Sequence, residues 1–407
     1  MKKILIGFVI GSVFIINCKL MKKEVSFKLT STEKKLINSF DEFGIKLFKE
    51  INEVETQERN IFISPLSVSM ALGMTYNGAR DSTERAMRNV LEFDGLSRTE
   101  INESYKYLHD VLKGLDEKVI FEIANSIWYE KSFEVKDSFI DINKKYFDAK
   151  VSALDFGDPS SVDIINNWVK KKTHGKIEKI LDYIRREEVM FLINAIYFKG
   201  TWTYKFDKEE TYKDYFYLQD GTQKLCDFMG QKISCDYFEN NEFQAVSLPY
   251  GQGLFRMMII LPKPEVELDS IISSLTIDDW VEWIERFKEC IVNVIIPKFK
   301  FKYSDSLNKV LINLGMGIAF TNKADFKGIS NDTLCISRVI HKTFVQVDEE
   351  GTEAAAVTMV GIGRLTSVGP TGVIFKADHP FLFIIYESYS NTILFIGKLV
   401  SPVWEET

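Results

Sequence analysis

The sequence predicts a single α+β domain, and three observations carry that prediction. Amphipathic helical patterns fill most of the first half of the chain, whereas runs typical of strands dominate the second half. The composition is that of a globular protein, with 45% apolar and 27% charged residues among 407. No internal repeat, low-complexity block or proline-rich linker divides the chain after residue 31. We therefore expect one large domain over residues 31–407.

The N-terminal residues predict export. Two lysines precede an apolar run, residues 4–16, which is too short for a comfortable membrane span and suits a secretory signal. Its ending, residues 15–18, resembles a bacterial lipobox, although Asn17 stands where Gly or Ala is usual. An ordinary cleaved signal that happens to contain Cys18 is the alternative. We expect an extracellular or cell-envelope protein, with residues 1–17 as signal peptide and 18–30 as a tether that begins at a lipidated Cys18.

The helices are predicted by apolar residues that recur three and four positions apart. The clearest stripe consists of Leu36, Phe40, Phe43, Leu47 and Ile51. Asp81 or Ser82 is the expected N-cap of a helix that ends near Val90. The expected helices cover residues 36–51, 70–76, 79–90, 101–115, 164–174 and 280–287.

The predicted strands are rich in β-branched and aromatic residues, and several are apolar almost throughout, which indicates burial on both faces. Residues 250–253, YGQG, lie between two of them and form a hairpin signal. The aromatic residues of 212–217 alternate, which fits a strand better than a sugar-binding platform. The expected strands cover residues 119–130, 189–200, 244–250, 254–262, 290–303, 343–347 and 373–387.

No catalytic constellation is recognisable, so we do not expect an enzyme or a cofactor. The sequence has four histidines but no HExxH, GxSxG or GxxxxGK[ST] motif. Residues 361–369 come closest to a dinucleotide-binding loop, but Thr366 stands where the third glycine belongs. The net charge of −7 is spread along the chain, which argues against a nucleic-acid partner.

Four cysteines follow Cys18 in the sequence: Cys226, Cys235, Cys290 and Cys335. None of their spacings resembles a zinc motif, so no metal site is expected. Buried free thiols are the favoured interpretation, because a core of this size needs no disulfide framework. A bridge between Cys226 and Cys235 is left open.

A long segment of small residues, DEEGTEAAAVTMVGIGRLTSVGPTG at 348–372, separates two strand-like runs. Its Ala and Gly content disfavours a strand, but alternate side chains would share one face if it became one. Such a run of about twenty-five residues is uncommon in a compact domain unless it is functional or disordered. The pattern favours a latent strand with an exposed peptide at 364–366 over an ordinary flexible loop.

Four motifs, in this order along the chain, resemble the serpin family over residues 31–403. They are residues 60–79, 192–206, 337–356 and 377–402. The resemblance implies a serpin fold with a large mixed sheet, smaller sheets and an exposed reactive-centre loop at about 349–374. It also implies a suicide-substrate inhibitor of extracellular serine peptidases, whose cleaved loop inserts into the main sheet and traps the acyl-enzyme. A non-inhibitory binding protein on the cell surface is the alternative.

The resemblance also assigns roles within the loop. The scissile bond is Leu365–Thr366, or Arg364–Leu365 if the hinge is one residue shorter. Leucine would suit a chymotrypsin-like or elastase-like peptidase, and arginine would suit a trypsin-like one. Small uncharged residues suit the inserting positions, because burying a charge between strands is costly. The hinge residues are Glu349, Gly351, Thr352, Glu353, Ala354, Ala355, Ala356, Val357 and Thr358.

Outside the loop, the resemblance points to two sets of residues. Ser64, Ser67, Asn194 and His341 match the polar cluster where the strands of the sheet must part. Trp202 and Lys298, the latter as partner of Glu349, match the place where insertion starts. The helix at 101–115 carries only a sparse set of basic residues, so we expect no polyanion cofactor. A monomer is expected.

Overall fold

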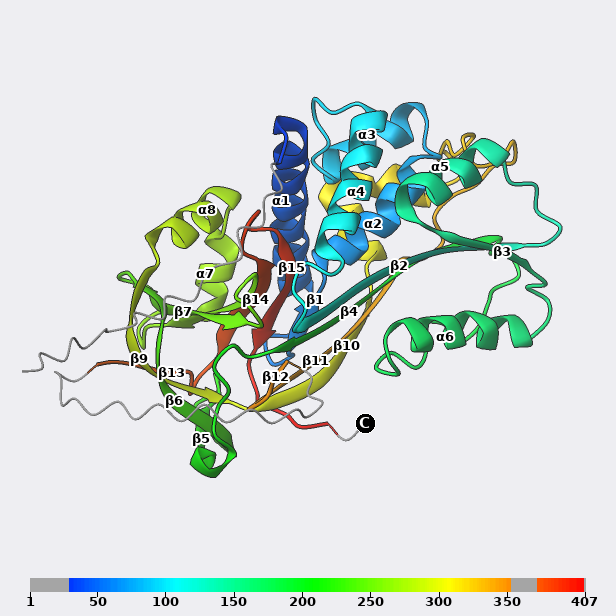
Figure 1. Ribbon diagram of the computed structural model, residues 1–407. Helices are drawn as coiled ribbons and strands as arrows, with labels where there is room; N and C mark the ends of the chain where they lie inside the picture. The colour runs from blue at the N-terminus through cyan, green and yellow to red at the C-terminus, as the bar shows by residue number, and fades with distance from the viewer. Residues whose placement is uncertain (1–28, 353–371, 406–407) are drawn as a thin grey trace, which may run out of the picture.

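The computed structural model describes residues 29–352 and 372–405 (Figure 1). A six-stranded mixed sheet lies at the centre of the candidate site. Its strands, in spatial order, are β10 (Phe299–Ser306), β11 (Ile340–Asp348), β12 (Gly351–Thr352), β4 (Met190–Thr201), β2 (Val119–Glu130) and β3 (Lys150–Leu154). β2 pairs antiparallel with β4 and parallel with β3. The strands expected at 119–130, 189–200 and 343–347 all belong to this sheet.

A second sheet joins nine strands in the same part of the chain. Its main path is β1 (Ile61–Ile63), β15 (Ile393–Leu399), β14 (Phe381–Glu387), β8 (Phe255–Pro262), β7 (Phe243–Tyr250), β6 (Gln223–Glu239), β9 (Lys288–Pro297) and β13 (Val373–Lys376). β5 (Tyr212–Tyr217) pairs with β6. The hairpin expected at 250–253 joins β7 to β8, and Gly251 and Gly253 take left-handed φ values of 53° and 91° there.

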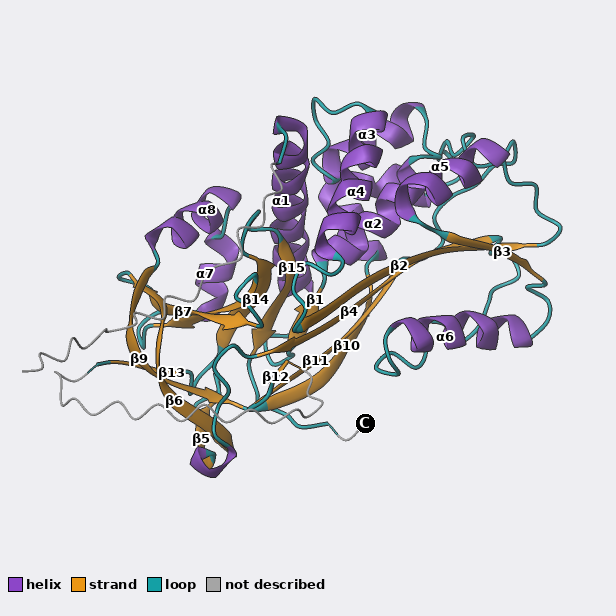
Figure 2. Ribbon diagram, in the orientation of Figure 1, coloured by secondary structure: helices purple, strands orange, loops and turns teal. Residues whose placement is uncertain are grey.

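The helices pack against both sheets. They are α1 (Ser31–Val54), α2 (Pro65–Tyr76), α3 (Asp81–Val90), α4 (Arg98–Leu112), α5 (Asp137–Phe147), α6 (Ser160–Lys172), α7 (Leu268–Ser274), α8 (Ile277–Arg286) and α9 (Asn308–Leu311), with short turns η1 (Lys208–Glu210), η2 (Ile312–Met316) and η3 (Gly317–Phe320). Figure 2 shows α2–α5 on one side of β2 and β4, and α6 on the other. This arrangement confirms the predicted α+β class.

Two apolar clusters hold these layers together. The larger cluster joins α1, α2 and the strands of both sheets. The smaller one lies under α6 and includes Trp128, Ile165 and Trp168, with the two indole rings edge-to-face at 6.0 Å. Because α6 packs through its own cluster, it is attached to the sheet without being part of the main core.

All six predicted helices are present, but each starts two to five residues away from its predicted start, and local contacts explain two of these differences. α4 begins at Arg98, ahead of residue 101, because Ser97 and Glu100 form a capping box. Asp81 or Ser82 as N-cap was wrong: Arg80 is the N-cap of α3, and its side chain makes no capping hydrogen bond. The N–H of Arg80 instead donates to the carbonyl of Asp325, so a distant segment sets the chain entry.

Two predicted strands are each divided in the structure. The run 290–303 splits into β9 and β10, which lie in different sheets. Pro297 has no N–H for a ladder, and the chain crosses to the six-stranded sheet directly after it. The run 373–387 splits into β13 and β14 around Pro380. In both runs the sequence is strand-like on either side of the proline, which concealed the break.

The cysteine expectations need two corrections. Cys226 and Cys235 lie on the same strand, nine positions apart and roughly 30 Å along β6, far beyond the reach of a disulfide. Among the cysteines that the structure describes, Cys235 is the one buried free thiol: Cys226 and Cys290 are half-buried and Cys335 is exposed.

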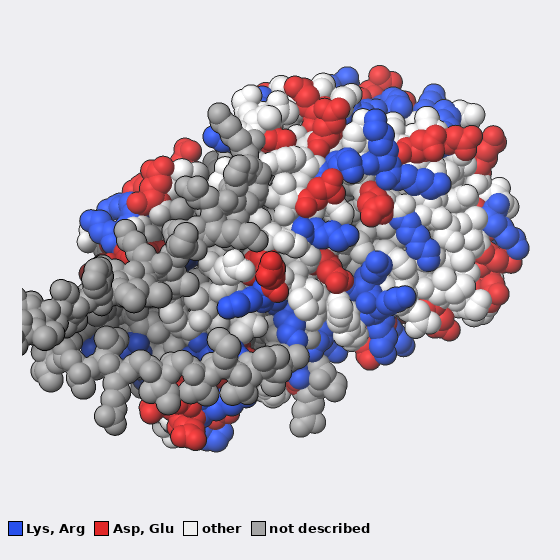
Figure 3. Space-filling view, in the orientation of Figure 1, with Lys and Arg blue, Asp and Glu red and all other residues white. Residues whose placement is uncertain are grey.

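The described part of the chain has a surface of mixed charge and no helix suited to span a membrane. Acidic and basic side chains are interspersed over α3–α6 on the face shown in Figure 3. Among the residues that the structure describes, no helix combines the length and the apolar character that crossing a bilayer requires.

Candidate functional site

One end of the candidate site is formed by β12, which lies between β11 and β4. The chain turns after Asp348 and returns as Gly351 and Thr352, which pair with β11 on one side and with Gly200 and Thr201 of β4 on the other. Gly351 has a φ of 149°, and a Cβ atom there would lie 2.1 Å from the carbonyl oxygen of Gly200. Only glycine fits this close approach of two backbones.

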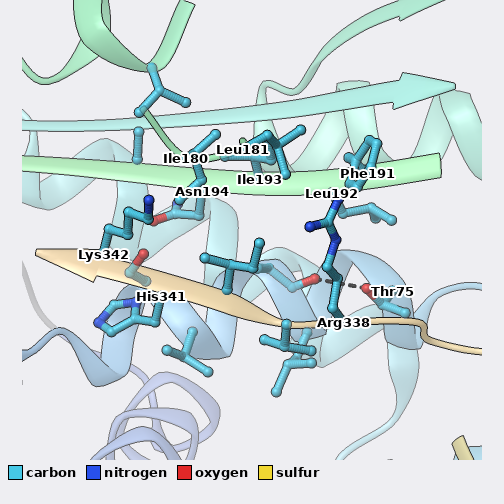
Figure 4. Close-up of a pocket in the computed structure, with 18 of the residues that line it drawn as sticks. Thr75, Ile180, Leu181, Phe191, Leu192, Ile193, Asn194, Arg338, His341 and Lys342 are labelled. Carbon is cyan, nitrogen blue, oxygen red and sulfur yellow. Dashed lines mark hydrogen bonds between the residues drawn. The ribbon is translucent and has the colours of Figure 1, made fainter. Parts of the chain in front are cut away.

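Beyond β12, its two neighbouring strands β4 and β11 are no longer joined to each other. Within the described residues, no ladder joins β4 directly to β11, and a cavity of about 480 Å³ lies between them (Figure 4). Its walls include residues 190–198 of β4, residues 337–344 at the start of β11, α2, and residues 180–181 from the segment after α6. Buried and partly exposed residues alternate along both strands, so their side chains point to the two faces of the sheet. The backbone edges of β4 and β11 therefore face each other across the cavity.

Glu349 is clasped at the turn between β11 and β12. Its Oε1 lies 2.9 Å from Lys298 Nζ and accepts a hydrogen bond of 2.7 Å from Thr211 Oγ1. Burial acts to raise the pKa of the Glu349 carboxyl, but the bonds from Lys298 and Thr211 outweigh it and the pKa lies below its ordinary value. The structure thus places Lys298 and Glu349 together, with Glu349 buried.

Trp202 lies over the same turn. Its Nε1–H donates to the carbonyl of Asp348 at 2.9 Å, and its backbone N–H donates to the carbonyl of Glu350 at 3.0 Å. The indole stacks on Tyr250 at 4.3 Å between centroids. The Tyr250 hydroxyl lies 2.6 Å from Thr352 Oγ1, so the two aromatic residues hold both strands of the turn. Sequence reasoning did not single out Tyr250.

Three of the four polar residues predicted beneath the sheet form one connected group. The Ser64 N–H donates to His341 Nε2 at 3.0 Å, and the Ser67 N–H donates to Ser64 Oγ at 3.3 Å at the start of α2. Ser64 Oγ donates in turn to the carbonyl of Leu394. Burial lowers the pKa of His341 to about 4, so the imidazole is neutral and accepts from Ser64.

Asn194 stands apart from this group. Its Nδ2 donates to Asn125 Oδ1 at 2.8 Å, across the β2–β4 pair. Its Oδ1 is buried and has no hydrogen-bond partner within the described residues. Figure 4 shows Asn194 and His341 on opposite sides of the cavity. A buried acceptor of this kind is suited to receive a backbone N–H from a strand placed between β4 and β11.

An ion pair that the sequence did not suggest closes the end of the cavity farthest from β12. Arg338 Nε lies 2.6 Å from Glu188 Oε1, with side-chain exposures of 11% and 0%. Ser337 Oγ and the Arg185 N–H also donate to the Glu188 carboxylate. Arg338 reaches across to the ring of Phe191 on β4, as Figure 4 shows. Glu188 and Arg338 are 150 residues apart in the chain, so no local sequence pattern could have revealed this ion pair.

Several predicted site residues lie outside the described residues. They are Cys18, the hinge residues Glu353, Ala354, Ala355, Ala356, Val357 and Thr358, and the bond residues Arg364, Leu365 and Thr366. Within the described ranges, no group of three His, Cys, Asp or Glu side chains could hold a metal ion.

A family model described as serpin (serine protease inhibitor) matches residues 38–402. The chain belongs to the serpin family. It is 35% identical to Iripin-2 of Ixodes ricinus over 374 residues, covering 90% of this chain and 94% of that protein. Members of the family are in general protease inhibitors rather than catalysts.

Solved serpin structures share the fold. The native state of tengpin, a thermophilic serpin, is 36% identical and superposes with a TM-score of 0.81 over 92% of this chain and 95% of that one. Human thyroxine-binding globulin in complex with thyroxine is 27% identical, with a TM-score of 0.82 over 92% of this chain and 100% of that one. These matches confirm the serpin fold that the sequence motifs predicted.

Proposed function

We propose that this serpin is a suicide-substrate inhibitor of an extracellular serine peptidase. The peptidase cleaves the reactive-centre loop, and the loop then inserts between β11 and β4 before the acyl-enzyme is hydrolysed. One observation carries the proposal: Gly351 and Thr352, near the start of the loop, already form a strand at one end of a cavity that separates β11 from β4.

The direction of the side chains supports insertion along this cavity. Thr352 is buried and its hydroxyl meets Tyr250. In a continued strand, every second residue would point to the same buried side as Thr352. Those residues are Ala354, Ala356 and Thr358, which are small and uncharged, whereas Glu353 would point to the opposite face.

Energy and length are compatible with trapping. About fifteen residues at roughly 3.3 Å each span about 50 Å, which is comparable to the length of the domain. Each new ladder hydrogen bond adds about 1 kcal/mol, so a full inserted strand stabilises the cleaved protein by on the order of 10 kcal/mol. The uncleaved protein is then metastable.

The proposed scissile bond is Leu365–Thr366, with Arg364–Leu365 as the alternative register. The first favours a chymotrypsin-like or elastase-like peptidase and the second a trypsin-like one. The predicted export signal and the lipobox-like Cys18 support a location outside the cell or on the cell envelope. It acts as a monomer.

Incubation of the purified protein with chymotrypsin, elastase and trypsin tests the proposal. We expect a covalent complex that survives boiling in detergent, and the mass of the released C-terminal peptide identifies the cleaved bond. Clean cleavage of the loop by every serine peptidase tried, without any complex, would instead support a non-inhibitory binding protein.

A further inference from the structure

Cys235 on β6 and Cys290 on β9 lie directly opposite each other in an antiparallel ladder. Residues paired in this way point their side chains to the same face of the sheet. The N–H of Lys298 donates to the carbonyl of Asp227, and hydrogen-bonded pairs alternate along such a ladder. Cys235 and Cys290 lie an even number of positions from that pair, so they form a hydrogen-bonded pair with Cα atoms ~5.5 Å apart. A disulfide requires Cα atoms roughly 4.4–6.8 Å apart, which such a pair provides, and Cβ atoms roughly 3.5–4.5 Å apart. A hydrogen-bonded pair holds its Cβ atoms about 1 Å farther apart than that, so the two strands must shift slightly for the bond to close.

The two thiols differ in access to solvent. Cys235 is 4% exposed and belongs to the main core, whereas Cys290 is half-buried at its edge. Burial raises the pKa of Cys235 to about 12, and it also raises the pKa of Cys290. Both thiols are therefore protonated at neutral pH, and a reagent from solution reaches Cys290 first.

The remaining described cysteines lack this arrangement. Cys226 pairs with Asp214 of β5. Cys335 is exposed in the segment before β11. Within the residues that the structure describes, Cys235 and Cys290 are the cysteines that share a ladder position, and the other two supply matched controls.

We propose that Cys235 and Cys290 form a cross-strand disulfide by exchange with a low-molecular-weight disulfide such as oxidised glutathione. The Cys290 thiol loses its proton and attacks the glutathione disulfide, which releases one glutathione thiol. The Cys235 thiol then loses its proton and attacks the Cys290 sulfur, which releases the second. Two protein thiols are oxidised by two electrons, and one glutathione disulfide is reduced to two thiols.

The bond ties β6 to β9, the strand that lies between β6 and β13 in the sheet. It closes a loop that contains β7, β8, α7 and α8, and it fixes the register of β6 on β9. β9 also pairs with β13, the strand that follows the reactive loop. The crosslink therefore stabilises the base on which β13 rests. The inference does not depend on the proposed inhibitory function.

Oxidation of the purified full-length chain tests the proposal. The protein is incubated with oxidised glutathione, alkylated in denaturant and analysed by peptide mapping. We expect a crosslinked pair of peptides that contain Cys235 and Cys290, and a melting temperature about 5 °C above that of the reduced protein. Glutathione retained on Cys290 with Cys235 still free, or a bond that involves Cys226 or Cys335, would overturn it.

Serine variants separate the pair from the other thiols. Cys290→Ser, at the more exposed position, should abolish both the crosslink and the redox-dependent shift in melting temperature. The double variant Cys226→Ser/Cys335→Ser should keep both. Because the crosslink is read in the wild-type chain, a variant that fails to fold leaves the outcome decided by peptide mapping.

Discussion

At the scale of single residues, the motifs indicated some neighbours in the site and missed others. They paired Lys298 with Glu349 and grouped Ser64 with His341, and the structure brings both sets together. They gave no sign of Thr211, which donates to Glu349. A motif shows which position matters, whereas the hydrogen-bond partner depends on the tertiary fold.

Thr352 tests the inserting face directly. Thr352→Arg would place a charge where the threonine is buried, at a cost of several kcal/mol, and insertion would be slower than hydrolysis of the acyl-enzyme. We expect the variant to be cleaved as a substrate, with at least a tenfold loss of stable complex per cleavage. Densitometry of complex and cleaved bands measures this ratio. Thr352→Ala, which stays small and neutral, should keep trapping, and equal trapping by the arginine variant would refute the role.

His341 predicts a pH dependence of stability. Its pKa falls from 6.5 to about 4 on folding, so the folded state favours the neutral imidazole. The stabilisation is complete above pH 6.5 and is lost progressively as the pH falls from 6.5 to 4, by about 3 kcal/mol. Unfolding by urea across this pH range measures the loss.

His341→Gln is the matched control for that experiment. Glutamine keeps an acceptor for the Ser64 N–H but does not titrate. The variant should lose less stability than the wild type between pH 6.5 and 4. Asp41 and Glu387 are buried carboxyls with raised pKa values, which act in the opposite direction in both proteins. Parallel pH profiles for the two proteins would contradict the assignment.

At the scale of elements, the sequence predicted long, strongly periodic segments well and chain crossings poorly. β2, β4, β7 and β8 follow their apolar runs closely. β6, with seventeen residues, was missed because its side chains alternate irregularly between polar and apolar. β12 has only two residues, one of them a glycine, and it exists because β11 and β4 supply partners on both sides.

The ion pair at the end of the cavity farthest from β12 gives a prediction about how the start of β4 is joined to the start of β11. Arg338→Met leaves the Glu188 carboxylate buried without its counter-ion, which should destabilise the protein by about 3–5 kcal/mol. The double variant Glu188→Gln/Arg338→Met removes both charges and should recover a large part of the loss. Denaturant unfolding of the four proteins of this cycle gives the coupling energy. Equal losses in the single and double variants would show that the pair does not join β4 to the start of β11.

At the scale of the whole molecule, the proposed mechanism makes the uncleaved protein the less stable form. Cleavage in the loop without a bound peptidase should allow insertion and raise the melting temperature by about 13 °C, given a gain of on the order of 10 kcal/mol. Calorimetry before and after limited proteolysis checks this. An unchanged melting temperature, with the loop shown to be cut, would exclude insertion.

The two-residue strand β12 has a kinetic consequence. Starting a new strand between two others is the slow step, because the chain must be ordered before any ladder bond forms. In this serpin, Gly351 and Thr352 have already made those first bonds on both sides. Under the proposed mechanism, insertion is therefore elongation without nucleation, and its rate is limited by how fast the cavity between β4 and β11 widens to accept the growing strand.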